Sequence, residues 1–261
     1  MDHLLADLLL GLIEGVTEFL PISSTGHLLI AERWLGARSD LFNIAIQAGA
    51  ILAVVLIYRE RLWQLVLGWR EAANRDYLLK LGVAFAVTAV LGLLVKHFGF
   101  ELPETVGPIA WALVIGGVVM LAAEAIAARR GSRGDVITWP VAVLVGVAQV
   151  VAGVFPGTSR SAATIFVALL FGVTNRAAAT EFAFLVGIPT MFAASGYEFA
   201  ELVLEGGLHG EDWSALAVAF VASALTAFAS VKWLLRYIQS HRFTPFAVYR
   251  FVLGAALLAF V

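Results

Sequence analysis

The most reactive set of side chains in the sequence lies in one short segment, GVTEFLPISSTGHLLIAE at 15–32, directly after Glu14. Glu14 and Glu18 are four residues apart, so a helix would place both carboxylates on one face. Two such carboxylates repel each other unless a cation or a proton lies between them. Carboxylate oxygens are the ligands that Mg²⁺ and Ca²⁺ prefer. We therefore expect Glu14 and Glu18 either to bind a divalent cation, Mg²⁺ or Ca²⁺, or to act in acid–base chemistry.

Hydroxyl and imidazole groups follow the two carboxylates in the same segment. Ser23, Ser24 and Thr25 are consecutive, and His27 comes two residues later. A serine that a histidine activates, with a carboxylate to orient the histidine, is a familiar nucleophile arrangement. Two assignments stay open: Ser24 attacks with His27 as its base, or His27 attacks directly. Glu18 either orients His27 or binds the metal, and a purely structural histidine is the alternative to both assignments.

A second polar break lies at 146–161, GVAQVVAGVFPGTSRS, and it matches 11–26 at a constant offset of 135. In this register the two prolines coincide, and so do two hydroxyl residues of each segment: Ser23 with Thr158, and Ser24 with Ser159. A chance similarity between two apolar helices is the alternative. The shared register of the proline and the hydroxyl pair favours a true internal repeat.

Each break is predicted to restart a helix after its proline, and a new helix N-terminus presents unpaired N–H groups to an anion. Arg160 lies beside the second set of hydroxyls, and an arginine within an apolar segment is costly and usually functional. Its planar guanidinium suits a pair of phosphate oxygens. An ion pair of Arg160 with Glu14 or Glu18 is the alternative, and both can hold together. The predicted phosphate-binding residues are Arg160, Ser23, Thr25, Thr158, Ser159 and Ser161, and weaker candidates for lining the site are Gln47, Gln149 and Glu181.

The elements that must position these residues lie in a membrane. The chain has 261 residues, of which 61% are hydrophobic and 14% charged, whereas soluble domains carry about 25% charged residues. With so little polar surface the chain is predicted to be a polytopic membrane protein. The absence of cysteine excludes disulfides, thiol catalysis and cysteine metal sites.

We expect one all-α integral membrane domain over 1–261, because backbone in hydrocarbon must satisfy its own hydrogen bonds. Six apolar runs are long enough to cross the bilayer: 41–58, 81–97, 108–128, 177–197, 215–232 and 246–261. Two further apolar regions, 3–35 and 136–172, are interrupted by Pro21 and Pro156. We predict that each of these two regions is a re-entrant helix–loop–helix hairpin.

The charges of the loops predict the orientation. Lys and Arg gather in the loops 59–80, 129–135 and 232–245, which we place in the cytoplasm, and acidic residues gather in 98–107 and 198–213, which we place outside. Equivalent spans then run in opposite directions, so repeat 1 (about 1–128) and repeat 2 (about 136–261) are predicted to be inverted. Hairpin 3–35 enters from outside and hairpin 136–172 from the cytoplasm, as in transporter-like architectures.

The motifs EGVTEFLPISSTGHL and PGTSRSAAT, with FNIAIQAGAILAV and EFAFLVGIP, resemble signature regions of the bacterial undecaprenyl-diphosphate phosphatases of the bacitracin-resistance type. The resemblance covers nearly the whole chain, and the first motif is long and highly specific. It implies hydrolysis of undecaprenyl diphosphate to undecaprenyl phosphate and inorganic phosphate. That reaction recycles the carrier lipid for cell-wall synthesis and confers bacitracin resistance.

The resemblance also implies roles for single residues. The family's acidic pair falls on Glu14 and Glu18, its essential histidine on His27, its motif serine on Ser24 and its phosphate-binding arginine on Arg160. The family commonly has glycine after Ser-Arg-Ser, where this chain has Ala162. That difference affects helix packing more than chemistry.

A flippase or transporter of a phosphorylated lipid is the alternative function, since an inverted repeat suits it equally well. The pair Ser24 and His27 discriminates between the two, because transport needs no nucleophile. A structural scaffold would leave the polar residues at the two breaks unexplained. We expect a multi-pass protein of the bacterial cytoplasmic (inner) membrane whose site faces the periplasm. Its expected partners are the bilayer and a polyisoprenyl diphosphate lipid, with no nucleic acid, and a homodimer stays an open alternative.

Overall fold

The computed structural model describes residues 3–99, 105–130, 134–207 and 211–259, so parts of the loops 98–107, 129–135 and 198–213 lie outside the described residues. Within the described ranges the chain forms eleven helices and no strand, which confirms the all-α prediction. The helices are α1 (His3–Thr17), α2 (Ser24–Leu35), α3 (Asp40–Ile57), α4 (Arg59–Leu67), α5 (Ala72–His97), α6 (Val106–Arg130), α7 (Trp139–Val154), α8 (Arg160–Leu170), α9 (Arg176–Leu204), α10 (Trp213–Ser240) and α11 (Thr244–Ala259).

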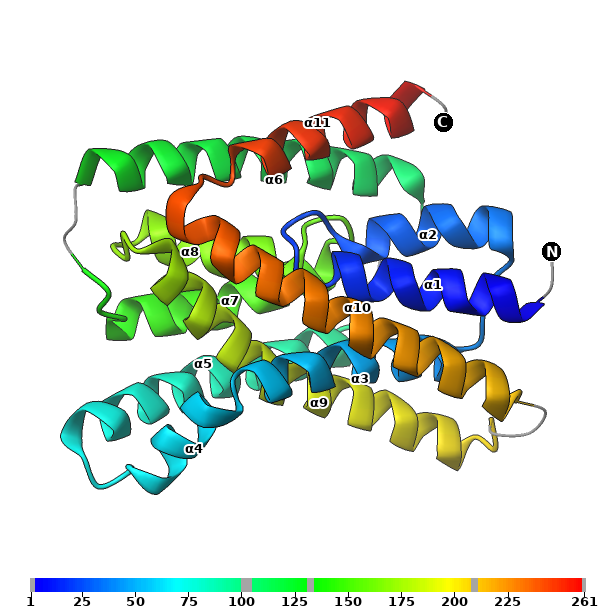
Figure 1. Ribbon diagram of the computed structural model, residues 1–261, viewed down its shortest axis with the longest axis horizontal. Helices are drawn as coiled ribbons and strands as arrows, with labels where there is room; N and C mark the ends of the chain where they lie inside the picture. The colour runs from blue at the N-terminus through cyan, green and yellow to red at the C-terminus, as the bar shows by residue number, and fades with distance from the viewer. Residues whose placement is uncertain (1–2, 100–104, 131–133, 208–210, 260–261) are drawn as a thin grey trace.

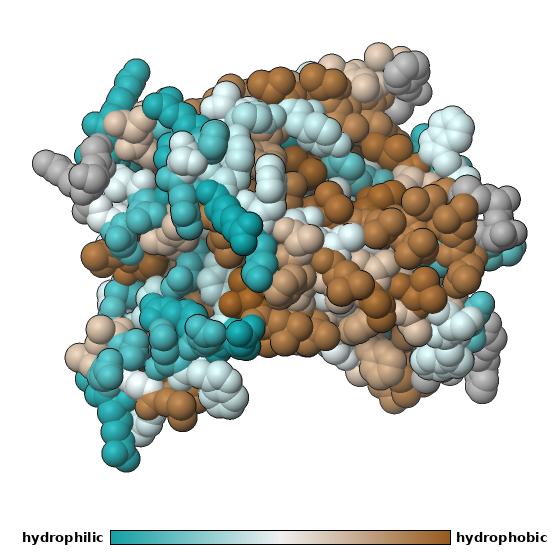
Figure 2. Space-filling view, in the orientation of Figure 1, coloured by the Kyte–Doolittle hydropathy of each residue, from teal (hydrophilic) through white to brown (hydrophobic). Residues whose placement is uncertain are grey.

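Five segments of the described chain are long and apolar enough to cross a membrane: α3 with α4, α5, α6, α9 and α10. Hydrophobic side chains cover much of the middle of the surface, and hydrophilic ones gather at the end that contains α4 (Figure 2). The chain is a multi-pass membrane protein. The sixth predicted span corresponds to α11, whose 16 residues extend about 24 Å, less than the roughly 30 Å of a hydrocarbon core.

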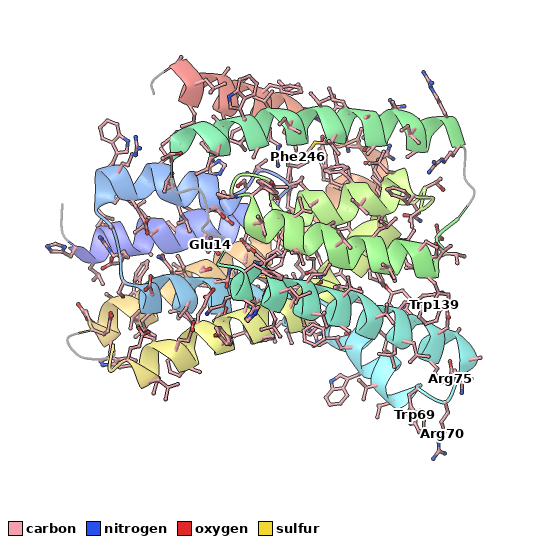
Figure 3. All side chains as sticks on the ribbon, turned by 180° about the vertical axis from the view of Figure 1, so that it is seen from behind. Glu14, Trp69, Arg70, Arg75, Trp139 and Phe246 are labelled. Atoms are coloured by element: carbon pink, nitrogen blue, oxygen red, sulfur yellow. The ribbon has the colours of Figure 1, made fainter. Side chains whose placement is uncertain are left out.

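The predicted loop 59–80 is largely helical, because it contains α4 and the start of α5. The search for apolar spans missed α4 because its sequence, RERLWQLVL, is amphipathic rather than apolar throughout. Leu65 is buried, whereas Trp63 is largely exposed. Trp69, Arg70 and Arg75 extend from the same end of the molecule (Figure 3).

The two interrupted regions each contain a helical hairpin: α1 and α2 extend over 3–35, and α7 and α8 extend over 139–170, within the predicted 136–172. The pair α1 and α2 begins and ends at one end of the molecule, and the pair α7 and α8 begins and ends at the other (Figure 1). The tips of both hairpins lie near the middle of the long axis (Figure 1). With 15 and 12 residues, α1 and α2 extend only about 22 and 18 Å.

Close helix crossings hold the hairpins in place. Along α1, Gly11 and Gly15 lie against the backbone of α10, where an added Cβ would collide with Ala219 and Ser223. Likewise Gly146 of α7 lies against the backbone of Ala84 in α5. Each hairpin therefore packs on a long helix from a distant part of the sequence.

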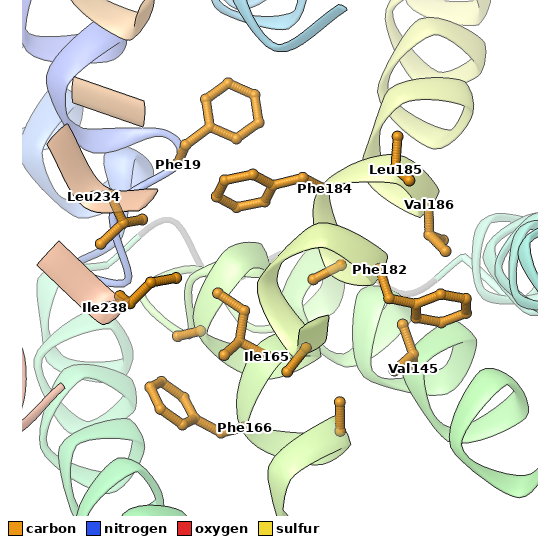
Figure 4. Packing of buried hydrophobic residues seen from close by; sticks show 14 of the residues in the cluster. Phe19, Val145, Ile165, Phe166, Phe182, Phe184, Leu185, Val186, Leu234 and Ile238 are labelled. Carbon is orange, nitrogen blue, oxygen red and sulfur yellow. The ribbon is translucent and has the colours of Figure 1, made fainter. Parts of the chain in front are cut away.

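Aromatic packing fixes the first tip to the core. Phe19 lies against Phe184 of α9, with ring centroids 5.2 Å apart in an edge-to-face arrangement (Figure 4). Phe184 also meets Tyr58 edge to face at 6.4 Å. Such edge-to-face pairs are favourable beyond the area that they bury. The tip between α1 and α2 is thus an ordered part of the core.

One buried arginine ties the two tips to α6 and α11. Arg250 of α11 is 0% exposed, and its guanidinium donates to five backbone carbonyls. They are Leu113 O at 3.1 Å from Nε, Pro21 O at 3.3 Å and Thr158 O at 3.0 Å from Nη1, and Ala112 O at 2.9 Å and Gly157 O at 3.0 Å from Nη2. Gly116 leaves the room for this group, because a Cβ there would overlap the guanidinium. The sequence analysis did not single out Arg250, although a charged residue in an apolar run was a signal.

Arg250→Lys should destabilise the protein, because an ammonium has only three donors and lacks the planar fork. At least two buried carbonyls would lose their partner, at about 1–3 kcal/mol each. For a chain of this size we expect the midpoint of thermal unfolding in detergent to fall by about 5–10 °C. Arg242→Lys, at an exposed position, is the control and should leave the midpoint unchanged. Equal midpoints for the two variants would contradict a structural role of the five bonds.

Candidate functional site

Two strained serines form the turns that aim the candidate side chains. Ser23 (φ 74°) and Ser159 (φ 69°) are the non-glycine residues with positive φ in the described chain. Each is the N-cap of the following helix, and its hydroxyl accepts a hydrogen bond from the backbone N–H three residues later, at 3.3 Å in both turns. Positive φ in a residue that is not glycine is uncommon and clusters at functional sites.

This geometry corrects the predicted register of the two segments. The alignment of 11–26 with 146–161 paired Ser24 with Ser159. The two N-caps are instead Ser23 and Ser159, at an offset of 136. The second turn is longer by one residue after its proline, and Gly157 accommodates the extra residue with φ +94°. As a result Ser24 and Arg160 occupy the corresponding first positions of α2 and α8.

The two tips are bonded to each other. The hydroxyl of Ser161 donates to Leu20 O at 3.1 Å and lies 3.0 Å from the hydroxyl of Ser159. All three groups are buried. Ser161 therefore joins the hairpins and is not free to bind phosphate in this arrangement.

Between the tips and α3 lies a cavity of about 280 Å³. Most of the predicted site residues line it, together with Glu32 and Asn43, which were not predicted. The polar lining consists of Glu14, Glu18, Ser23, Ser24, Thr25, Glu32, Asn43, Gln47, Ser159 and Arg160. Glu14 lies in the interior of the molecule, at the meeting point of the hairpins (Figure 3). The cavity collects acidic, hydroxyl and guanidinium groups in one place.

Ser24 has a carboxylate as its partner. The Ser24 hydroxyl donates to Glu18 Oε2 in a short hydrogen bond. A carboxylate that accepts the proton of a serine hydroxyl can serve as its general base. The carboxylate, and not His27, therefore occupies the position of a base.

The expected hydrogen bond between Ser24 and His27 is not found between these two described residues. His27 Nδ1 lies 2.7 Å from Ser23 O, and Nε2 lies 2.6 Å from the hydroxyl of Tyr249 in α11. The two rings are stacked, with centroids 5.6 Å apart and planes inclined by 6°. Because a carbonyl can only accept, Nδ1 of the neutral ring carries the proton and the Tyr249 hydroxyl donates to Nε2. His27 faces α11 and does not line the cavity.

Four buried polar atoms on the wall of this cavity have no hydrogen-bond partner within the described part of the chain: Glu14 Oε2, Glu32 Oε1, Asn43 Oδ1 and Arg160 Nη1. Glu14 is only 2% exposed, and a buried polar group without a partner is costly. Three of the atoms are hard oxygen acceptors and one is a cationic donor. The cavity therefore suits a ligand that has both anionic oxygens and an associated cation.

The donor chemistry fits a divalent cation at Glu14 and Glu18, since Mg²⁺ and Ca²⁺ prefer oxygen ligands. Among the described residues no three acidic or histidine side chains come close enough to bind one ion. Hydroxyl, amide, water or ligand oxygens would have to complete the coordination sphere.

The remaining predicted residues lie elsewhere. Thr158 does not line the cavity, and its carbonyl accepts a hydrogen bond from Arg250. Gln149 donates to the Thr88 hydroxyl at 3.0 Å between α7 and α5, and Glu181 pairs with Arg61 at 3.0 Å. Neither of the two lines the cavity, whereas Gln47 does and accepts a bond from a serine of α9.

Sequence reasoning missed four residues of the site and its support. Glu32 was noticed in the polar segment but given no role, and its spacing of eight residues from Ser24 places both on one face of α2. Asn43 lies one helical turn before Gln47, which was a weak local signal. Tyr249 lies 222 residues from His27, so no local pattern could have identified the contact, and the same holds for Arg250 and the tips.

Tyr249→Phe should lower phosphate release from a polyprenyl diphosphate by about tenfold, mainly in kcat. The hydroxyl fixes the tautomer and orientation of His27, which bonds Ser23 O and so supports the turn that aims Ser24. A tenfold loss of rate corresponds to about 1.4 kcal/mol, which a small misplacement of Ser24 can cause. Tyr197→Phe removes a hydroxyl that also has two partners, Lys96 and Glu201, and serves as the control. If both variants retain full activity, the Tyr249 hydroxyl has no influence on the reaction.

Comparison with known proteins agrees with the motifs. The model of the family described as bacitracin resistance protein BacA matches residues 7–256. A relative from Rhizobium etli (strain CIAT 652) is 68% identical over 258 residues, which cover 99% of this chain and 97% of the relative. Relatives from Xanthomonas euvesicatoria pv. vesicatoria (strain 85-10) and Xanthomonas campestris pv. campestris (strain 8004) are 65% and 64% identical over 258 residues, with 99% of this chain and 97% and 98% of the relatives covered. All three relatives carry the name undecaprenyl-diphosphatase. With a match that covers nearly its whole length, the chain belongs to the bacitracin resistance protein BacA family.

Proposed function

We propose that this protein is a membrane phosphatase that hydrolyses undecaprenyl diphosphate to undecaprenyl phosphate and inorganic phosphate. In that role it recycles the carrier lipid for cell-wall synthesis and confers bacitracin resistance. The name of the relatives supports the substrate. The observation that carries the proposal is a hydroxyl bonded to a carboxylate, Ser24 to Glu18, in the same cavity as Arg160. A flippase would need Arg160 and the helix ends but no such nucleophile, so we do not favour it.

In the proposed reaction Ser24 Oγ attacks the terminal phosphorus and passes its proton to Glu18. The bond from that phosphorus to the bridging oxygen breaks, and undecaprenyl phosphate leaves with the bonding electrons. A water molecule then attacks the phosphoserine, the bond to Oγ breaks, and Glu18 returns its proton to Oγ. The released inorganic phosphate keeps the water oxygen and its protons.

Charge stabilisation is the main requirement of phosphoryl transfer. Arg160 supplies an unpartnered Nη1 on the cavity wall, and its fork can bind two phosphate oxygens. The N-termini of α2 and α8 meet at the cavity, and their backbone N–H groups favour an anion. Ser23, Thr25 and Ser159 add hydroxyls to this binding region, whereas Thr158 and Ser161 support the second tip.

A divalent cation, Mg²⁺ or Ca²⁺, belongs to the proposal, with Glu14 and Glu18 as its protein ligands. When bound, it would neutralise the charge of the diphosphate and of the leaving group. Glu14 keeps its Oε2 free for this purpose.

His27 acts through the tip: its Nδ1 and its backbone N–H both bond Ser23 O, which helps to hold the strained turn that aims Ser24.

We also propose the finer topology. Six transmembrane helices and two re-entrant hairpins, 3–35 and 136–172, would form an inverted repeat of about 1–128 and 136–261 within one membrane domain. Matching turns at Ser23 and Ser159 support the repeat. We propose the bacterial inner membrane as the location and a cavity that faces the periplasm. All residues of the reaction come from one chain, so it does not require the homodimer, which stays a prediction.

Purified protein should release inorganic phosphate from undecaprenyl diphosphate, and Ser24→Ala should abolish at least 99% of that release while it still binds the radiolabelled lipid. A nucleophile acts on the chemical step rather than on ground-state binding, so kcat should fall by about 10² or more. Ser240→Ala, at an exposed position, is the control. Ser24→Ala with wild-type turnover would exclude the proposed nucleophile, and no release by the wild-type protein would exclude the function.

Chelation with EDTA should stop the reaction, and Mg²⁺ or Ca²⁺ should restore it. In the same samples Ca²⁺ should raise the midpoint of thermal unfolding of the wild type, because a ligand of the folded state stabilises it. Glu14→Gln should lose most of that thermal shift. Full turnover in EDTA, with no thermal shift, would leave the two glutamates with acid–base roles alone.

The topology can be tested with single cysteines, since the chain contains none. Glu205→Cys lies at the end of α9, and Arg70→Cys lies in the turn between α4 and α5; both positions are exposed. In intact spheroplasts an impermeant thiol reagent should label position 205 and leave position 70 unlabelled until the membrane is opened. The opposite pattern would place the mouth of hairpin 3–35 in the cytoplasm.

A further inference from the structure

An apolar groove of about 590 Å³ runs along the outside of the second hairpin. Its walls are α6 and α7, which hardly touch each other, and its floor is α8, which packs against both. Trp111, Phe155 and Phe171 line it, and Thr158 supplies its one hydroxyl. Figure 3 shows this side of the molecule, with α6 above the helices of the second hairpin.

The groove and the polar cavity lie on two sides of the second tip. Near the end of α7, Ala152 lines the cavity whereas Val151 and Phe155 line the groove. In the following turn the two neighbours of Thr158 line the cavity, whereas Thr158 itself lines the groove. No residue lines both spaces, so the turn of the second tip separates the cavity on one side from the groove on the other. A ligand with a polar head in the cavity can pass an apolar tail across this single turn into the groove.

The direction of the groove also fits such a ligand. From Phe155 to Leu144 it follows α7 for about 16 Å, away from the end of the molecule at which the first hairpin enters (Figure 1). A lipid whose head group arrives from that end must extend its tail in the opposite direction. The groove runs in that direction.

We infer that this groove binds the first isoprene units of the substrate's polyprenyl tail while the diphosphate occupies the cavity. The inference rests on the proposed function. Because the tail leaves lipid rather than water, the hydrophobic effect contributes little and the gain comes from packing against the groove. The groove orients the substrate and distinguishes long from short prenyl chains.

The test fills the far end of the groove and leaves the cavity untouched. Val119 lines the groove, whereas its neighbour Val118 does not and is 56% exposed. Val119→Trp and Val118→Trp are therefore matched variants of α6. Their KM and kcat would be measured with undecaprenyl diphosphate and with the short-chain geranyl diphosphate in the same mixed micelles.

For Val119→Trp we expect KM for undecaprenyl diphosphate to rise about fivefold, which corresponds to about 1 kcal/mol. Geranyl diphosphate has only two isoprene units, too few to span a groove about 16 Å long, so its KM should not change, and Val118→Trp should resemble the wild type with both substrates. Equal kinetics of the two variants would mean that the tail does not use the groove, and would overturn the inference while the phosphatase activity stands. An equal loss with both substrates would assign Val119 a structural role and also overturn it. Absence of activity in the wild type would instead reject the proposed function.

Discussion

The architecture depends on how the broken helices satisfy their backbone carbonyls without water. Each break leaves carbonyls without a helical partner, and at membrane depth such groups are costly. Arg250 supplies donors to the carbonyls of Pro21, Gly157 and Thr158 at once, and anchors the same guanidinium to α6. Its hydrogen bonds replace solvent for both tips. Arg250 bonds the carbonyls of Gly157 and Thr158, in the turn that also lines the cavity. Its positive charge therefore adds to the electrostatic field that favours an anion in the cavity.

The cavity itself combines groups that would not be stable together without a ligand. Glu14 and Glu18 lie within it close to Arg160, and several of their neighbours keep atoms without partners. Protein stability would favour pairing all of these groups, as Ser24 and Glu18 are paired. Unpaired groups of both signs on one wall are typical of a site preorganised for charges that arrive with the substrate. The strained serine at each tip belongs to the same arrangement, because it aims a side chain of the next residue into the cavity.

Local signals in the sequence were sufficient for the hairpins but not for the contacts between them. The prolines, the capping serines and the length of the apolar runs predicted regions 3–35 and 136–172, and α1 with α2 and α7 with α8 occupy them. The pairing of Ser24 with His27 failed because Tyr249, far away in sequence, determines where the imidazole points. The register failed by one residue because Gly157 can add a residue to the turn without a change in hydropathy. Arg250 and Glu32 were visible as charges, but the packing of α11, α6 and α2 decides that Arg250 bonds the tips and that Glu32 lines the cavity.

The crossings of α1 with α10 and of α7 with α5 have a consequence for biosynthesis. A membrane protein is made from its N-terminus, so α1 leaves the ribosome long before α10, whose backbone covers Gly11 and Gly15. Until then the first hairpin lacks the helix on which α1 packs, and Arg250 of α11 is made later still. The order of synthesis is reversed for the second hairpin, because its packing partner α5 is made before α7. The hairpin that is synthesised first is therefore the last to find its packing partner, and a chain truncated before α10 would leave Gly11 and Gly15 without the helix that covers them.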